Sequence, residues 1–492
     1  MNKFNQKVIT RFAPSPTGFM HVGGVRTALY AWLLAKKSGG QFILRIEDTD
    51  KEREVEGSIE HIKKSLLWLG LKWDQGPDIG GEHSPYIQSE RLDLYKKYAE
   101  KLIKKGLAYA DTSSEEETDV LRKTAEEEKK PFLFRDYRPT SSPVWDGSQP
   151  LRFKVPELKR YEWKDLVWGN LSAGPEALDD FILIKSDGYP TYNFAHIVDD
   201  IEMGVTHVVR GQEFISSTPK FLSIYDALGV VPPHFVTTPP IMGADGKKKL
   251  GKRDGAKDIM EYEHEGYLPE TMLNYLAFLG FNPGGEKEIY AIEELVELFD
   301  INKIQRSGAQ WSDDKLNWMN KEHMKRLPEN IRDNEIVTRL KKNSLINQNQ
   351  KINDGNFLLK LCPIISDHIS KWGDIDIMIG AGELDYFFNS PQYEKNQLFW
   401  KGKITVEETK KHLEFVLNTL KNEPEESFSD AEKIKNLVFD YATENGRGEV
   451  LWPVRVALSG RDKSPDPFTL IYILGKEETI LRINRALDKL SK

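Results

Sequence analysis

The stretch RFAPSPTGFMHVGG, residues 11–24, decides the fold class, because it places prolines and glycines between two regular patterns. Before it, the apolar and β-branched run KVITRFA (7–13) predicts a strand buried in a parallel sheet. After it, VRTALYAWLLAKK (25–37) has helical spacing of its apolar residues and ends at a glycine pair. QFILRI (41–46) is a second predicted strand. Strand, loop, helix and strand form a βαβ unit, so the chain begins with an α/β fold.

The loop itself lies where such folds bind ligands. In a doubly wound sheet, ligands bind beyond the carboxyl ends of the strands, and a helix N-terminus there favours phosphate. Gly18, Gly23 and Gly24 let a ligand approach the backbone, and His21 can donate a hydrogen bond to a phosphate oxygen. The loop fits neither a Walker A motif nor GxGxxG. Taken alone, it also fits a simple strand-to-helix turn with a surface histidine.

Length and composition limit the number of domains and the classes of function that the chain can have. At about 150 residues per domain, the 492 residues predict three or four domains. The single cysteine, Cys362, excludes a disulfide framework and a multi-thiolate zinc site. The net charge of −8 argues against a non-specific nucleic-acid coat but leaves local basic patches possible. The chain lacks an apolar run of about 20 residues and a signal-peptide core, so we expect a cytoplasmic protein without membrane contact.

The pattern of predicted elements changes along the chain. We expect helices over 55–69 and 91–105, a charged helix and a Pro/Ser-rich loop between about 106 and 150, short strands at 151–155 and 181–185, strands again at 207–214 and 234–242, and mostly helices beyond about 265. The middle part therefore looks like an insertion of different architecture. The segment ADGKKKLGKRDGAKD (244–258) is a basic, glycine-rich loop, which alone indicates only a solvated surface.

Together, the early and late loops carry a resemblance. His-x-Gly at 21–23 and KLGKR at 249–253, in this order, resemble the HIGH and KMSKS motifs of class I aminoacyl-tRNA synthetases. The surrounding sequence resembles the bacterial-type glutamyl-tRNA synthetase family over nearly the whole chain. The stretches that carry this likeness are TRFAPSPTGFMHVGGVRTAL (10–29), LRIEDTD (44–50), SDGYPTYN (186–193), VVRGQE (208–213), KLGKRDGA (249–256), DDKLNWMN (313–320) and ALSGRDKSPDPFTLIYILGKE (457–477).

The resemblance implies a two-step ligation. L-glutamate and ATP, which enters with Mg²⁺, give a glutamyl-adenylate and pyrophosphate. The glutamyl group then passes to the 3′ end of tRNA(Glu), and AMP is released. No covalent enzyme intermediate is involved, so catalysis rests on positioning and on neutralising phosphate charge.

The resemblance also assigns residues. His21, Lys249 and Lys252 match the catalytic positions, with the lysines holding the triphosphate in the transition state. The ATP-binding set comprises Ser15, His21, Gly23, Glu213, Met242, Lys249, Leu250, Gly251, Lys252 and Arg253. Gly24 stands in place of the second HIGH histidine, and Gly251 replaces the usual KMSKS serine, which removes a hydroxyl and adds backbone freedom.

The glutamate-binding set implied in the same way comprises Arg11, Ala13, Ser15, Glu47, Tyr192, His196 and Arg210. Arginine suits the two carboxylates because it binds them bidentately and stays charged. Glu47 matches the residue that takes the α-amino group. His196 stands where the family often has asparagine or another small residue, and which arginine meets which carboxylate is open.

The implied architecture is multidomain α/β plus all-α. We expect a class I Rossmann catalytic domain in two halves, 1–78 and 192–243, an inserted acceptor-end-binding domain at 79–191, a stem-contact domain with the KMSKS-like loop at 244–325, and a helical anticodon-binding region at 326–492. Some relatives bind zinc through cysteines in the insertion, whereas this chain has Ala110 and Ser113 there, so we expect no zinc and no other bound metal. The expected partner is tRNA(Glu), with tRNA(Gln) as a second candidate, and the expected state is a monomer.

Three alternatives remain at this stage. A glutaminyl-tRNA synthetase would carry FDDTN where this chain has IEDTD (46–50). A short paralogue that glutamylates a modified tRNA base would lack the anticodon region. A catalytically silent tRNA-binding paralogue finds its only support in Gly251.

Overall fold

The computed structural model describes residues 7–251, 257–402 and 404–492. The chain divides into two compact units, Met1–His323 and Met324–Lys492. No helix in the described ranges is both long and apolar enough to cross a membrane.

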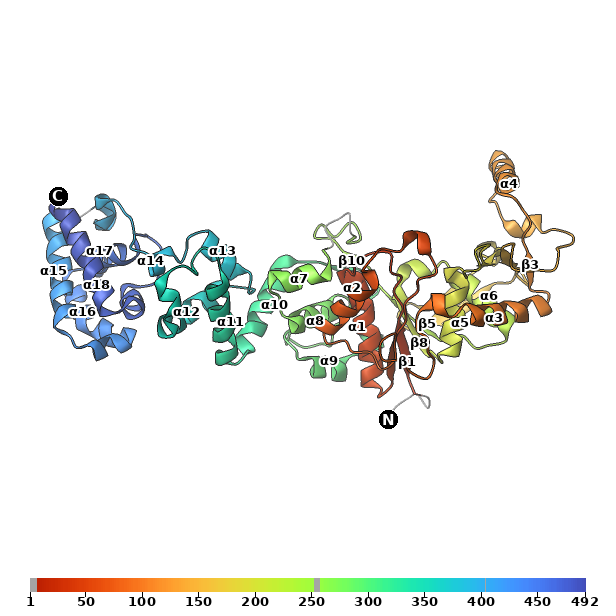
Figure 1. Ribbon diagram of the computed structural model, residues 1–492, viewed down its shortest axis with the longest axis horizontal. Helices are drawn as coiled ribbons and strands as arrows, with labels where there is room; N and C mark the ends of the chain where they lie inside the picture. The colour runs from red at the N-terminus through yellow and green to blue at the C-terminus, as the bar shows by residue number, and fades with distance from the viewer. Residues whose placement is uncertain (1–6, 252–256, 403) are drawn as a thin grey trace. The chain divides into compact units, whose positions relative to one another are not determined.

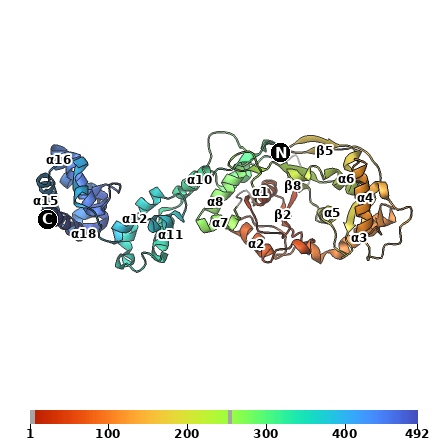
Figure 2. The ribbon, with the colours of Figure 1, turned by 90° about the horizontal axis from the view of Figure 1, so that it is seen from above.

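A six-stranded sheet forms the centre of the first unit (Figures 1 and 2). Its strands, in spatial order, are β2 (Gln41–Leu44), β1 (Ile9–Phe12), β8 (His207–Gly211), β9 (His234–Thr238), β5 (Tyr161–Asp165) and β6 (Gly169–Ala173). All neighbours are parallel except β5 and β6, which form an antiparallel hairpin. The doubly wound α/β prediction is confirmed, because both faces of the sheet are covered by helices.

Alternating side chains of the strands point into two cores. Phe42 and Leu44 pack into the core that also contains side chains of α1 (Val22–Lys37), α2 (Ser58–Trp68), α8 (Pro269–Phe278) and α9 (Ile292–Leu298). Ile43 points to the other core, which contains side chains of α3 (Leu92–Lys104), α5 (Tyr192–Glu202) and α6 (Thr218–Leu228). Figure 1 shows these two helix layers on opposite sides of the strands. The arrangement follows from the two-residue period of a strand.

The predicted inserted range, 79–191, contributes to two sheets. One is a separate antiparallel sheet of β3 (Ala108–Ala110), β4 (Leu151–Phe153) and β7 (Phe181–Ile184), beside which α4 (Glu115–Glu127) projects (Figure 1). The other is the large sheet, because β5 pairs in parallel with β9. Sequence patterns did not predict the β5–β6 hairpin, whose exposed alternate residues and short strands resemble a polar loop. The five segment boundaries stay predictions.

The remainder of the first unit is mainly helical, with one short parallel pair, β10 (Ile241–Met242) and β11 (Ala309–Gln310), and the helix α7 (Ile259–Glu265). The boundary between the two units falls within α10 (Asp313–Arg326). In the second unit the described residues form helices and no strand, as predicted from the sequence. These helices are α11 (Glu329–Lys342), α12 (Gly355–His368), α13 (Asp374–Gly380), α14 (Asp385–Phe388), α15 (Val406–Asn422), α16 (Ala431–Asn445), α17 (Arg447–Ser459) and α18 (Pro467–Ser491).

Candidate active site

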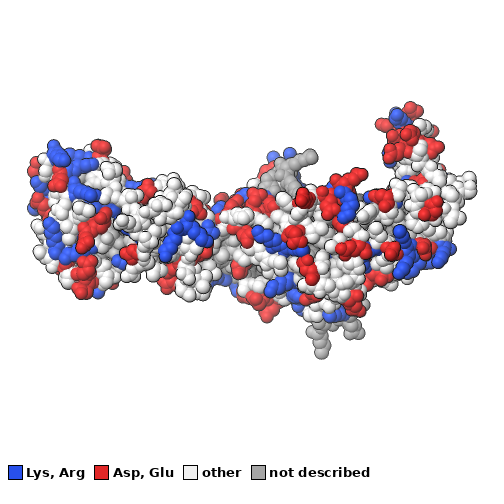
Figure 3. Space-filling view, in the orientation of Figure 1, with Lys and Arg blue, Asp and Glu red and all other residues white. Residues whose placement is uncertain are grey.

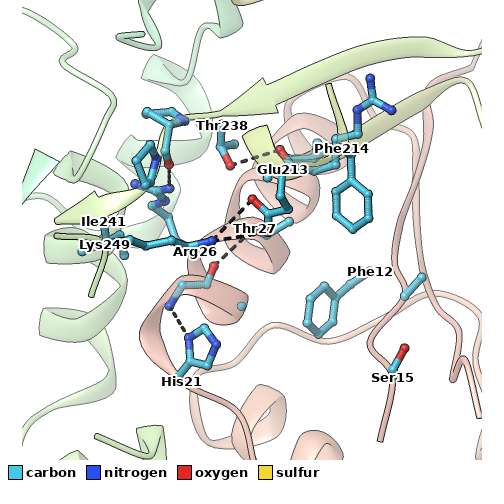
Figure 4. Close-up of a pocket in the computed structure, with 18 of the residues that line it drawn as sticks. Phe12, Ser15, His21, Arg26, Thr27, Glu213, Phe214, Thr238, Ile241 and Lys249 are labelled. Atoms are coloured by element: carbon cyan, nitrogen blue, oxygen red, sulfur yellow. Dashed lines mark hydrogen bonds and ion pairs between the residues drawn. The ribbon is translucent and has the colours of Figure 1, made fainter. Parts of the chain in front are cut away.

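A pocket of about 370 Å³ opens at the carboxyl ends of β1 and β8, beside the N-terminus of α1 (Figure 4). This is the position at which ligands bind in open α/β sheets. Twelve of the residues implied by the resemblance line it: Arg11, Ala13, Ser15, His21, Gly23, Glu47, Tyr192, Arg210, Glu213, Lys249, Leu250 and Gly251. The fold thus brings together residues that lie more than 200 positions apart in the sequence.

Of the other four residues implied by the resemblance, two are not among the lining residues and two lie outside the described residues. His196 is buried one layer behind the pocket, where its ring stacks on Tyr192 at 4.6 Å and its Nδ1 lies 2.6 Å from the Tyr192 carbonyl oxygen. Met242 lies in β10 and is not among the lining residues. Lys252 and Arg253 lie outside the described residues.

Sequence reasoning assigned no role to Arg26, which lines the pocket from the second turn of α1. Its guanidinium donates to the carbonyl oxygens of Pro239 and, at 2.6 Å, Leu279. Arg26 and Thr27 lie three and four residues after Gly23, so helical spacing alone places all three on one face. This helical spacing could have indicated that Arg26 faces the pocket. Its two carbonyl partners, more than 200 residues away, could not be predicted from the sequence.

His21 begins α1 as its N-cap. Its Nδ1 accepts a hydrogen bond from the backbone N–H of Gly23 at 3.1 Å (Figure 4). The proton of the neutral ring is therefore on Nε2, which makes that atom a donor. The first turn of α1 holds no acidic residue, so the partial positive charge of the helix N-terminus is not offset by its own side chains.

Arg210 is a buried cation at the end of β8, 6 % exposed. It donates to the Thr218 hydroxyl at 2.6 Å, and its guanidinium carbon lies 4.1 Å from the centre of the Phe235 ring. Burial lowers its pKa to about 10, so it is still charged at neutral pH. No described carboxylate lies within ion-pair distance of it, and its Nε has no partner in the described part of the chain. The buried carboxylate of Asp165 acts in the opposite direction on the pKa of Arg210 without forming an ion pair with it. A buried arginine that forms no ion pair favours an anionic ligand.

Three other buried arginines, unlike Arg26, form ion pairs with carboxylates in the described part of the chain. The carboxylate of Asp200 forms ion pairs with Arg11 at 3.1 Å and with Arg45 at 2.8 Å, and Arg45 also forms an ion pair with Glu47 at 2.8 Å. Behind them, Arg91 meets Asp199 at 2.7 Å. These three arginines and three carboxylates balance each other in charge. Burial raises the pKa of Glu47, and Arg45 acts in the opposite direction.

The mouth of the pocket holds a looser pair. Nζ of Lys249 lies 3.4 Å from the carboxylate of Glu213, and both side chains are more than half exposed (Figure 4). An exposed pair of this kind contributes about 0–1 kcal/mol, so an incoming phosphate can replace Glu213 as the partner of Lys249 at little cost.

The buried His196 predicts a pH dependence of stability. Burial lowers its pKa from 6.5 to about 4. In the unfolded chain this histidine therefore takes up a proton near pH 6.5, whereas in the folded chain it does so only near pH 4. The stability that is present above pH 6.5 is lost as the pH falls from 6.5 toward 4. Relative to a His196→Asn variant, the wild type should lose about 2 kcal/mol more between pH 7 and pH 5.

Urea unfolding of both proteins at the two pH values measures this difference. His207, whose pKa is also lowered to about 4, is common to both proteins and cancels. Equal losses of stability in the two proteins would show that His196 takes up its proton in the folded state.

Comparison with known proteins identifies the family. A family model described as "tRNA synthetases class I (E and Q), catalytic domain" matches residues 7–318, and one described as "Anticodon binding domain" matches residues 335–487. A glutamate–tRNA ligase of Clostridium kluyveri is 42% identical over 98% of this chain and 98% of its own length. One of Clostridium botulinum is also 42% identical, over 98% and 99%.

Two solved structures share the whole fold. A crystal structure of a glutamate tRNA ligase from Elizabethkingia meningosepticum in complex with its amino acid has a TM-score of 0.87 at 35% identity, covering 99% of this chain and 100% of that chain. A glutamate-tRNA synthetase from Elizabethkingia anophelis has a TM-score of 0.85 at 35% identity, covering 98% and 100%. The resemblance read from the two motif loops is confirmed. The catalytic-domain match covers more than half of the chain and includes every residue that lines the pocket. With full-length relatives at 42% identity, the chain belongs to the class I tRNA synthetases for glutamate and glutamine (E and Q).

Proposed function

We propose that the chain is a glutamate–tRNA ligase, which forms glutamyl-adenylate from L-glutamate and ATP and transfers the glutamyl group to the 3′ end of tRNA(Glu). The observation that carries the choice of amino acid is Arg210, a buried cation that forms no ion pair among the described residues. The guanidinium of Arg26, the other such cation in the pocket, is held by two backbone carbonyl oxygens. The side-chain carboxylate of glutamate would pair with Arg210, whereas the neutral amide of glutamine would leave it without an ion pair. The names of the full-length relatives support the same choice.

In this proposal ATP lies along the loop and the N-terminus of α1. The Nε2 donor of His21 and the N-terminal N–H groups of the helix face phosphate, and Gly23 allows its close approach. Lys249 exchanges Glu213 for the triphosphate, and Ser15, Leu250 and Gly251 complete the contacts. Met242, Lys252 and Arg253 keep their implied roles as predictions. Mg²⁺ enters as part of the MgATP substrate.

Glutamate occupies the inner part of the pocket. Arg210 and Arg11 face its carboxylates, while Glu47 takes the α-amino group. Because Arg11 is already paired with Asp200, Arg210 supplies a positive charge that no described ion pair takes up. Ala13, Ser15 and Tyr192 line the space between, and His196 acts from behind by holding Tyr192.

The tRNA contacts in this proposal begin in the predicted insertion. Helix α3 carries Lys96, Lys97, Lys101 and Lys104, and Figure 3 shows basic side chains gathered over it, while acidic ones gather over α4. A hollow of about 560 Å³ beside α3 is lined by Lys96, Lys104 and Trp145, and also by Glu100 and Asp146. Its tryptophan offers a surface on which a base of the single-stranded 3′ end can stack, while the basic charge comes from α3 as a whole. The region from 326 onward would bind the anticodon. We propose a cytoplasmic monomer, the compartment being that of protein synthesis.

We propose that no zinc is bound. The insertion lacks cysteine, and the single Cys362 is buried in α12 of the other unit. Within the described residues, no group of three or more His, Cys, Asp or Glu side chains has a geometry that suits a metal. Metal analysis of the purified protein tests the proposal, and one equivalent of zinc per chain would contradict it.

Aminoacylation with purified components tests the function. Glutamate and glutamine should be offered with tRNA(Glu) and with tRNA(Gln) in separate reactions. We expect glutamate to be joined to tRNA(Glu) with consumption of ATP, and glutamine to be rejected. Charging of tRNA(Gln) with glutamate would identify the second candidate partner. Equal use of glutamine, or no charging of either tRNA, would contradict the proposal.

A further inference from the structure

A histidine outside the pocket connects the loop before His21 with the N-terminus of α7. His61 lies on α2, and its Nε2 is 2.8 Å from the carboxylate of Asp258. Its Nδ1 accepts the backbone N–H of Met20 at 3.4 Å, so the ring proton is on Nε2 and points to Asp258. The ring also stacks on Phe19 at 4.5 Å with an angle of 22° between the planes. Neither His61 nor Asp258 lines the pocket.

The partners of His61 flank the functional motifs. Phe19 and Met20 directly precede His21, and Asp258 follows the KLGKR motif (249–253). Backbone contacts connect the same two segments. The N–H of Ile259 donates to the Met20 carbonyl oxygen at 3.0 Å, and the backbones of His21 and Asp258 form an isolated antiparallel β-bridge.

Asp258 is itself held in place. Its side chain caps α7 by accepting the Met260 N–H at 2.9 Å. A carboxylate fixed by a helix cap, and contacted by a ring that rests on the first loop, connects that loop with the start of α7. Beside it, Lys64 and Glu263 join the same two helices only by an exposed pair at 3.9 Å.

We propose that His61 is a positioning residue for the ligation reaction: through Asp258 it fixes the start of α7, five residues beyond the KLGKR motif in sequence, against the loop that carries His21. This inference rests on the proposed function. His61 touches neither substrate site, so its effect should appear when His21 and the loop lysines must act on one triphosphate together. An interaction that matters only in the transition state changes kcat and leaves KM nearly unchanged.

Three replacements of His61 distinguish the loss of its hydrogen bond to Asp258 from the loss of side-chain volume. His61→Ala should lower kcat of aminoacylation roughly ten- to hundredfold, the scale of a small misplacement, with KM for ATP and glutamate within about twofold of wild type. His61→Gln places an amide nitrogen where Nε2 was and should restore most of kcat. His61→Asn imitates Nδ1 but cannot reach Asp258, so it should stay slow.

Two further variants test the partner and the background. Asp258→Ser keeps a preferred helix cap but removes the partner of His61, so it should be as slow as His61→Ala, and the double variant should be no slower than either. Lys64→Ala, which removes only the exposed pair, should be as active as wild type. Circular dichroism confirms that each variant is folded.

The outcomes are distinct. If His61→Ala is as fast as Lys64→Ala, if His61→Asn recovers as well as His61→Gln, or if Asp258→Ser keeps the wild-type kcat, the positioning role is wrong. If wild type and Lys64→Ala both fail to charge tRNA(Glu), the proposed function is wrong instead.

Discussion

Replacement of Arg210 by methionine should abolish glutamate ligation and yet leave the protein at least as resistant to unfolding as the wild type. Methionine fills similar space without the charge, and the charge it removes has no carboxylate partner in the described part of the structure. We therefore expect kcat/KM for glutamate to fall roughly a thousandfold, because losing one partner of a buried charge pair costs about 4 kcal/mol. Aminoacylation kinetics and thermal unfolding measure the two effects on the same sample.

Arg45→Met is the matched control for this expectation. Arg45 is fully buried like Arg210 but pairs with Glu47 and Asp200. Its removal leaves buried carboxylates without their cation, which costs about 3–5 kcal/mol of stability. A lower unfolding temperature in Arg45→Met and an unchanged or higher one in Arg210→Met would show that the protein keeps Arg210 for its ligand. If Arg210→Met were as unstable as Arg45→Met, or still preferred glutamate, Arg210 would be structural.

The fold could be predicted where the information is local. The β1–α1–β2 unit follows from patterns within 40 residues. The start of α1 was placed at residue 25 instead of Val22, because histidine is not among the preferred N-cap residues. The β5–β6 hairpin was missed for a different reason. Its two strands pair with each other locally, but they are short and carry many exposed residues, so they lack the apolar pattern of a buried strand. Only the parallel contact of Asp165 with Phe235 of β9, 70 residues away, joins the hairpin to the large sheet, and no local pattern indicates it.

In the active site, too, local features could be predicted and long-range contacts could not. Motif order identified most residues that line the pocket, because the residue types reflect the chemistry. Charge compensation could not be predicted, because Arg11 and Asp200 meet only after folding. Nothing in the sequence distinguishes Arg11, which forms an ion pair, from Arg210, which forms none in the described part of the chain. The positions of Arg26 and His61 likewise depend on partners more than 190 residues away.

Replacement of His21 by asparagine should lower kcat about 10²- to 10³-fold without weakening α1, and this variant separates the two roles of the histidine. Asparagine is a preferred N-cap, so its side-chain oxygen can accept the Gly23 N–H as Nδ1 now does. It has no atom at the position of Nε2, the proposed donor to the triphosphate. The loss is on the scale seen when one preorganised donor to developing negative charge is removed.

His21→Gln is the complementary variant, since its amide nitrogen replaces Nε2 while the cap is lost. It should recover part of kcat and lose about 1 kcal/mol of stability, the usual cost of removing a helix cap. Aminoacylation rates at saturating ATP and unfolding temperatures of both variants test the assignment. If His21→Asn keeps the wild-type kcat while His21→Gln is slow, the histidine serves only to begin α1. The phosphate contact would then have to come from the helix N–H groups themselves, which the asparagine variant leaves in place.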